Sequence, residues 1–214
     1  MGIESHKNKR LEMLIQIVIV IVSFVGLILN FKLFYSIKGL LYYTILSNIY
    51  VFTFYLCVII LKLKNNFKKN NIYYCLKGLV LQSILCTMIV YNFLIVPFGE
   101  IAVYVNNSLE CNIVHLVVPL MVLLECLLFE DKRVLKYKYI IYWVIPTVIY
   151  MIFLMTYSKL GGLFLDNSTV IYPFLDFNNN GYMAMLLISI IYIVTGFLII
   201  FIDNKMIESL GGKL

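Results

Sequence analysis

Charged residues are scarce in this sequence. Only 13% of its 214 residues are Asp, Glu, Lys or Arg, against about 25% in a typical soluble domain. Hydrophobic residues make up 63% of the chain, and its mean hydropathy is +0.96. This composition excludes a soluble enzyme or a soluble nucleic-acid-binding protein and predicts a protein embedded in a lipid bilayer.

Familiar catalytic and cofactor-binding signatures are also missing. The sequence has no H-E-x-x-H, G-x-S-x-G or G-x-x-x-x-G-K-[ST] motif, which excludes the ordinary metalloprotease, lipase and nucleotide-binding classes. Its five cysteines are odd in number and lie mostly in apolar runs, as is typical of buried hydrophobic side chains. Cys111 and His115 lie one helical turn apart, but no second His or Cys pair completes a metal site. We therefore expect no metal and no cofactor.

Six long apolar runs occupy most of the chain. Each is about long enough to cross the hydrocarbon core as a helix, which takes about 20 residues. The sequence shows no internal repeat and no domain boundary. The prediction is a single all-α integral membrane domain over residues 1–214, with six transmembrane helices at about 11–31, 40–61, 75–98, 111–129, 139–157 and 181–202.

The positions of the basic residues predict the orientation. The N-terminus, the segments 62–69 and 132–138 and the C-terminal tail hold 13 of the 17 Lys and Arg residues. By the positive-inside rule, both termini are cytoplasmic. The net charge of +6 then determines the orientation in the membrane and attracts anionic lipid headgroups, so nucleic acid is not an expected partner. A composition rich in Asn, Lys and Ile indicates an AT-rich bacterium, and we expect a multi-pass protein of the bacterial plasma membrane.

One external loop, residues 158–180, is long and largely apolar. Apolar loops of this length usually fold back onto the rest of the protein. The loop is therefore expected either to form a lid over an outward-facing cavity or to lie in the headgroup layer.

Polar side chains inside the spans are costly and require an explanation. His115 is the only histidine in any span. At 1.5 Å per residue, His115 and Thr44 each lie about 6 Å from the outer end of their spans, Asn92 about 9 Å and Asn48 about 12 Å. Three helices thus place polar groups at nearly one depth, below the unusual loop, and this coincidence marks a candidate site. The simpler alternatives are that Thr44 bonds its own helix and that the two asparagines join helices.

Pro119 and Glu125 lie in the same span as His115 and bear on its surroundings. Pro119 cannot donate a hydrogen bond to the His115 carbonyl, so the helix is expected to kink there and the freed carbonyl to find a partner or water. Glu125 lies too far toward the cytoplasm to orient His115, and we expect it to pair with Lys77 or Gln82 in a structural role.

Three segments resemble a known family when taken together. They are 42–48 (YYTILSN), 114–120 (VHLVVPL) and 172–176 (YPFLD). In this order they are similar to the androgen-induced-protein and ADTRP-like family of integral membrane hydrolases, in its bacterial branch, the Pr-six-Pr family. The resemblance covers about residues 40–200. It implies a multi-span helical fold and, from the animal members, hydrolysis of fatty acid esters of hydroxy fatty acids by one Thr and one His.

The resemblance assigns those two roles to Thr44, as the nucleophile, and His115, as the general base. Asn48 or Asn92 would donate a hydrogen bond to the oxyanion, while Tyr172 and Asp176 from the outer segment are further candidates for substrate binding or a third catalytic role. Asp176 is equally expected as an exposed loop acid or as a helix cap. The substrate would be a membrane lipid ester. The alternatives are a small-solute carrier or channel, for which an intramembrane histidine is also expected, and a non-catalytic lipid-binding scaffold.

Overall fold

The structure, a computed structural model, describes residues 2–34, 37–98, 108–164, 167–172, 175–176 and 181–210. Every regular element in these residues is helical. In chain order they are α1 (Gly2–Phe34), η1 (Ile37–Leu41), α2 (Tyr43–Leu63), α3 (Asn71–Val90), η2 (Tyr91–Ile95), α4 (Val96–Phe98), α6 (Leu109–Asn112), η3 (Ile113–Val117), α7 (Val118–Phe129), α8 (Tyr139–Lys159) and α9 (Gly181–Leu210). The element η1 is a 3₁₀ turn, whereas η2 and η3 are π-helical turns.

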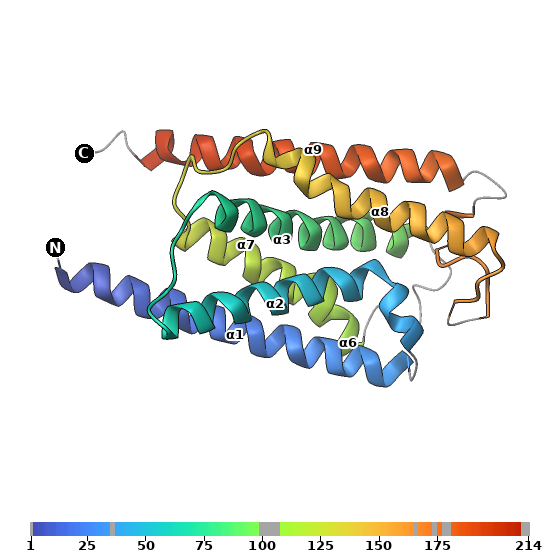
Figure 1. The fold of residues 1–214 in the computed structure, drawn as a ribbon, viewed down its shortest axis with the longest axis horizontal. Helices are drawn as coiled ribbons and strands as arrows, with labels where there is room; N and C mark the ends of the chain where they lie inside the picture. The colour runs from blue at the N-terminus through green and yellow to red at the C-terminus, as the bar shows by residue number, and fades with distance from the viewer. Residues whose placement is uncertain are drawn as a thin grey trace.

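Within the described residues, six helical stretches are long and apolar enough to cross a membrane. They are Lys9–Asn30, Tyr43–Leu63, Asn71–Ile95, Leu109–Phe129, Tyr139–Lys159 and Gly181–Lys205. Each of the six expected spans falls on one of these stretches, so the chain has the build of a multi-pass membrane protein. The start of α1 and the end of α9 lie at the same end of the bundle (Figure 1).

The second span begins later than the hydropathy of the sequence suggests. Residues 37–41 are mostly apolar but form the short 3₁₀ turn, and Tyr42 is extended, with φ −86° and ψ 129°. The α-helix therefore starts at Tyr43, and Thr44 is its second residue. This places Thr44 in the first turn of α2, at the end of the bundle.

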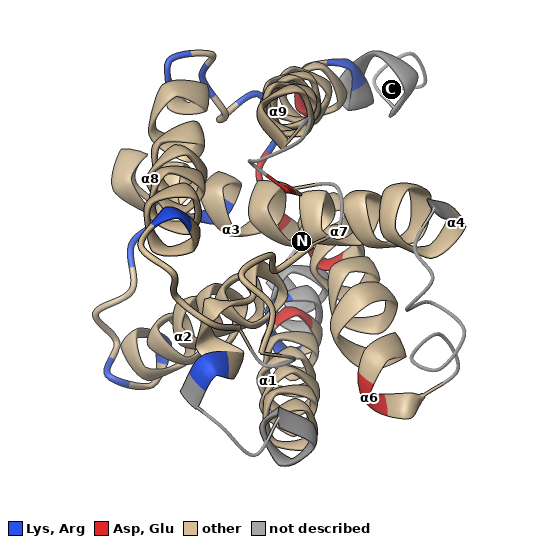
Figure 2. Ribbon diagram, turned by 90° about the vertical axis from the view of Figure 1, so that its right-hand side faces the viewer, with Lys and Arg blue, Asp and Glu red and all other residues tan. Residues whose placement is uncertain are grey.

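Helix α3 is the centre of the bundle. It packs against α2, α7, α8 and α9, and in the end-on view α1 and α9 lie on opposite sides of the molecule (Figure 2). Many large apolar side chains on the outside of the bundle are exposed, as lipid-facing residues of a membrane protein would be, for example Leu128, Ile141 and Met183.

Two glycines let helices approach closely where side chains would clash. A Cβ on Gly78 of α3 would lie 2.0 Å from Cζ2 of Trp143, whose indole is fully buried and donates to the Cys75 carbonyl over 2.8 Å. A Cβ on Gly26 of α1 would lie 2.7 Å from Cγ2 of Ile113, at the start of η3. The second approach positions the turn that carries His115.

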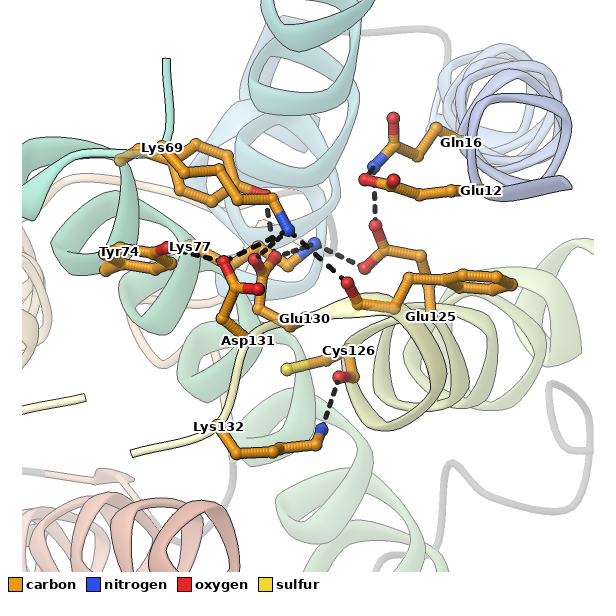
Figure 3. A network of polar contacts seen from close by, with 12 residues as sticks. Glu12, Gln16, Lys69, Tyr74, Lys77, Glu125, Cys126, Glu130, Asp131 and Lys132 are labelled. Carbon is orange, nitrogen blue, oxygen red and sulfur yellow. Dashed lines mark hydrogen bonds and ion pairs between the residues drawn. The ribbon is translucent and has the colours of Figure 1, made fainter. Parts of the chain in front are cut away.

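A cluster of charged residues lies at the end of the bundle where α1 begins and α9 ends. The Lys77 ammonium and the Glu125 carboxylate, each 1% exposed, form an ion pair, and Glu125 also accepts hydrogen bonds from Gln16 (2.6 Å) and Tyr55 (2.9 Å) (Figure 3). The expected pairing of Glu125 with Lys77 is therefore present, whereas Gln82 bonds the Tyr192 carbonyl instead. Because a buried charge is tolerated only when it is paired, this network joins α1, α2, α3 and α7.

Candidate functional site

Two π-helical turns build the centre of the site. The turn η3 ends at Val117, two residues before Pro119, and η2 ends at Ile95, two residues before Pro97. A proline lacks the N–H that would bond the carbonyl four residues earlier, and its ring collides with that carbonyl, so the turn widens. The sequence predicted this distortion before Pro119, but the matching turn before Pro97 was missed, although Pro97 itself was the signal.

The Thr44 hydroxyl and the His115 imidazole meet at the end of α2. Thr44 Oγ1 lies 3.0 Å from His115 Nε2, and His115 Nδ1 lies 2.9 Å from the Cys111 carbonyl oxygen. A carbonyl oxygen can only accept a hydrogen bond, so this contact favours the tautomer with the proton on Nδ1. Nε2 then carries the lone pair that accepts the Thr44 hydroxyl proton. The imidazole is only 8% exposed.

Tyr91 and Cys111 complete the surroundings of the imidazole. The Tyr91 ring stacks on the His115 ring, with 3.6 Å between centroids and an interplanar angle of 18°. The Cys111 thiol donates to the Tyr91 hydroxyl over 2.8 Å and also lies 3.2 Å from His115 Nδ1. These contacts hold the ring from its face and from its Nδ1 edge. Sequence analysis missed Tyr91, although it directly precedes the candidate Asn92.

The two candidate asparagines bind main-chain carbonyls next to the site. The Asn92 amide donates to the Met88 carbonyl over 2.8 Å and to the His115 carbonyl over 3.3 Å. The second bond replaces the helical bond that Pro119 cannot make. The sequence analysis expected this carbonyl to find either a partner or water, and in the structure its partner is the Asn92 amide.

Asn48 plays a similar part on the neighbouring helix. Its amide donates to the Thr44 carbonyl over 2.8 Å and to the Val114 carbonyl over 3.2 Å. It thereby ties the turn that carries Thr44 to the turn that carries His115. In both asparagines the two amide hydrogens are directed at carbonyl oxygens, so oxyanion binding would require either amide to leave its present partners.

A cavity opens on the other side of Thr44. It has an empty volume of about 480 Å³, counted out to its mouth, and Thr44, Tyr91 and Tyr172 are among its lining residues. Hydroxyl groups meet at its wall, where the Tyr43 hydroxyl lies 2.6 Å from that of Tyr192 and 3.1 Å from that of Thr147. The remaining surface is mostly apolar, so the cavity suits a largely hydrophobic group with few polar atoms.

Some of the described residues of the loop 158–180 reach this cavity. Tyr172 lines the cavity and packs edge-on against Tyr42, with 6.0 Å between ring centroids. Burial raises the pKa of the Tyr172 phenol, which is therefore neutral at physiological pH. Asp176 is not among the lining residues, and its main-chain carbonyl accepts the N–H of Gly181 at the start of α9, over 2.8 Å. Of the loop 158–180, residues 165–166, 173–174 and 177–180 lie outside the described residues, as do Pro173 and Phe174 of the motif.

Metal ligation finds no support in the described ranges. Among these residues, no three His, Cys, Asp or Glu side chains lie close enough to hold an ion. The His115 Nδ1 that a metal shared with Cys111 would need lies instead within hydrogen-bond distance of the Cys111 carbonyl.

Comparison with known proteins adds no relative. No protein-family model, no curated protein sequence and no solved structure matches this chain.

Proposed function

We propose that this protein is a membrane-embedded hydrolase of a lipid ester, with Thr44 as the nucleophile and His115 as the general base. The observation that carries this proposal is the 3.0 Å contact between Thr44 Oγ1 and His115 Nε2, combined with the bond from His115 Nδ1 to the Cys111 carbonyl. Enzymes that transfer acyl groups use a nucleophile that is hydrogen-bonded to a base, and a third group orients the base. Here the orienting group is a main-chain carbonyl and not a carboxylate.

The chemical steps follow from this arrangement. As Thr44 Oγ1 attacks the ester carbonyl carbon, His115 Nε2 takes the hydroxyl proton, and a tetrahedral intermediate forms. The protonated imidazole then donates this proton to the leaving alkoxide, which departs as the alcohol and leaves the acyl group on Thr44. In the second half, water attacks the acyl carbon and gives a proton to Nε2. The bond from the acyl carbon to Thr44 Oγ1 then breaks, Nε2 returns the proton to Oγ1, and the acid is released.

The position of Thr44 at the start of α2 provides electrostatic support for this reaction. The first N–H groups of a helix have no acceptor within the helix, and the helix dipole is positive there. The main-chain N–H of Thr44 belongs to this first turn. It is a fixed donor beside the nucleophile, and one such donor to an oxyanion lowers a barrier by about 3–4 kcal/mol.

The cavity and the membrane support the proposed substrate class. An amphipathic lipid would place one apolar group in the cavity beside Thr44 and its ester at the helix end, near the headgroup layer. The resemblance to the androgen-induced-protein family points to fatty acid esters of hydroxy fatty acids. The distribution of basic residues supports cytoplasmic termini, an outward-facing site and a bacterial plasma membrane.

Covalent labelling and ester turnover test this proposal. Membranes that contain the wild type are treated with a fluorophosphonate probe and, separately, with a fatty acid ester of a hydroxy fatty acid. Thr44→Ala should abolish labelling and turnover, and His115→Ala should lower turnover by about 10²–10⁴-fold, the usual contribution of general base catalysis. Thr44→Ser keeps the hydroxyl and should retain activity.

Thr53→Ala is the matched control. Thr53 lies on the same helix as Thr44 but is exposed, does not line the cavity and donates to the Ile49 carbonyl of its own helix over 2.7 Å, so this variant should keep the activity. If the wild type neither labels nor hydrolyses the ester, the hydrolase proposal is wrong. Solute flux in vesicles would then favour a carrier, and lipid binding without flux would favour a scaffold.

A further inference from the structure

A second hollow lies on another side of α3, and neither Thr44 nor His115 is among its lining residues. Helices α7 and α9 both pack on α3 and leave a groove between them, with an empty volume of about 830 Å³. Its floor is formed by α3 residues from Leu81 to Ile89, and one wall by α9 residues from Thr195 to Asp203. We call it the α3–α7–α9 groove. Its lining is almost entirely apolar.

The length of this groove matches one leaflet of a bilayer. Its α3 and α9 sides each extend over nine residues, and the eight rises of 1.5 Å between the first and the last make the groove about 12 Å long. Half of the hydrocarbon core is about 15 Å thick. The groove therefore fits an acyl chain that enters from one leaflet and ends near the middle of the membrane.

A lysine lies at the end of the groove that is nearer to the charged cluster. Lys132 lines this end, and its ammonium donates to the Cys126 carbonyl over 3.1 Å (Figure 3). It also donates to the Leu127 carbonyl over 2.9 Å. An ammonium has three N–H donors, so one remains for another acceptor. Among the described residues, no carboxylate lies within ion-pair distance of Lys132.

Basic residues outnumber acidic ones around this end of the groove. Asp203 also lines it, and its carboxylate accepts the Leu135 N–H over 3.1 Å and attracts Lys132. The nearby Glu130 and Asp131 both contact Lys69, at 2.8 and 3.6 Å. Arg133 and Lys136 follow in the same loop. An anionic group at the end of the groove would therefore be attracted by several cations.

We propose that the α3–α7–α9 groove is a binding site for a phospholipid with an anionic headgroup, which holds one acyl chain in the groove and its phosphate at Lys132. The site is separate from the proposed hydrolase site. The lipid fills the space between α7 and α9 and neutralises the lysine at the end of α7. Its recognition combines apolar contact along one leaflet with a charge-assisted hydrogen bond at the membrane surface.

Lipid retention measured by native mass spectrometry tests this site. The full chain is purified in detergent and offered equal amounts of phosphatidylglycerol and phosphatidylcholine with the same acyl chains. The wild type should retain one phosphatidylglycerol in preference. Lys132→Gln should weaken that preference about fivefold, because one lysine close to anionic headgroups contributes about that much. Leu198→Trp, at a half-exposed residue that lines the groove, should displace the lipid by filling the space.

Lys138→Gln is the matched control, since it removes a lysine of the same loop that does not line the groove. It should retain phosphatidylglycerol as the wild type does, and thermal unfolding of all variants verifies that they are folded. Equal retention of the two lipids by the wild type would overturn the proposal. Equal losses of phosphatidylglycerol in Lys132→Gln and Lys138→Gln would also overturn it. So would the finding that the wild type binds a second copy of the protein in place of a lipid and that Leu198→Trp releases this copy.

Discussion

The Asn92 side chain donates a hydrogen bond to the main-chain carbonyl of His115, over 3.3 Å. This carbonyl is the group that loses its helical partner because Pro119 follows four residues later. A residue of the third span thus repairs the distorted turn of the fourth span at the residue that carries the imidazole. The proline and the asparagine therefore act as a pair, and the geometry at His115 depends on both.

This pairing predicts an interaction between two substitutions. Asn92→Leu leaves the His115 and Met88 carbonyls without their amide donor and should destabilise the protein by about 1–3 kcal/mol and lower ester turnover. Pro119→Ala restores an N–H to the turn, so Asn92→Leu should cost less in that background. Thermal unfolding of the two single variants and the double variant measures the coupling. Strictly additive effects would show that the two residues act independently.

Tyr91 is expected to act on His115 through its ring more than through its hydroxyl. Tyr91→Phe keeps the stacked ring and loses the hydroxyl with its bond from the Cys111 thiol, so turnover should change little. Tyr91→Leu removes the stack as well and should lower turnover clearly more, because the imidazole loses the contact on its face. Equal turnover in these two variants would contradict this role. Circular dichroism serves as the control for folding.

The buried Lys77–Glu125 pair predicts a large and asymmetric effect on stability. Lys77→Met leaves the Glu125 carboxylate buried without its cation and should destabilise the protein by about 3–5 kcal/mol. Adding Glu125→Leu to this variant removes the unpaired charge and should recover much of the loss. Asp131→Asn is the comparison, because Asp131 is 57% exposed and its contact with Lys69 should contribute less than about 1 kcal/mol. Unfolding in detergent, followed by fluorescence, distinguishes these cases.

Alanine substitutions at Gly78 and Gly196 should differ in their steric cost. A methyl group at Gly78 would enter the indole of Trp143, so Gly78→Ala should separate α3 from α8 and lower the unfolding temperature strongly. At Gly196, a Cβ would lie 3.0 Å from Oε1 of Gln82, the far end of a flexible side chain, and Gly196→Ala should cost less. A similar loss in both variants would argue against the close packing of Trp143 on α3.

Hydropathy located the six spans because a membrane helix must be continuously apolar over about 20 residues. Depth along the spans also indicated that Thr44 and His115 lie near each other, since few polar side chains occur there. The start of α2 was expected at residue 40 because residues 37–41 are apolar, and hydropathy cannot separate a 3₁₀ turn from the first turn of an α-helix.

The partners of the site residues were less accessible from the sequence. Asn48 and Asn92 bind carbonyl oxygens of the main chain, which every residue possesses, so no sequence pattern marks them. The stacking of Tyr91 on His115 depends on the rotation of two helices relative to each other. Residue type and depth alone do not determine that rotation.

The ion-pair network around Lys77 and Glu125 has a consequence for the permeability of the membrane. A bundle with a cavity at one end conducts water or protons unless its other end is blocked. Between the cavity and the charged cluster, Val51, Ile84 and Val118 are fully buried, and they form an apolar barrier. The Lys77 and Glu125 charges behind this barrier are paired with each other, so neither draws in an ion. Water that enters the cavity end of the bundle is therefore not led on to the ion-paired end.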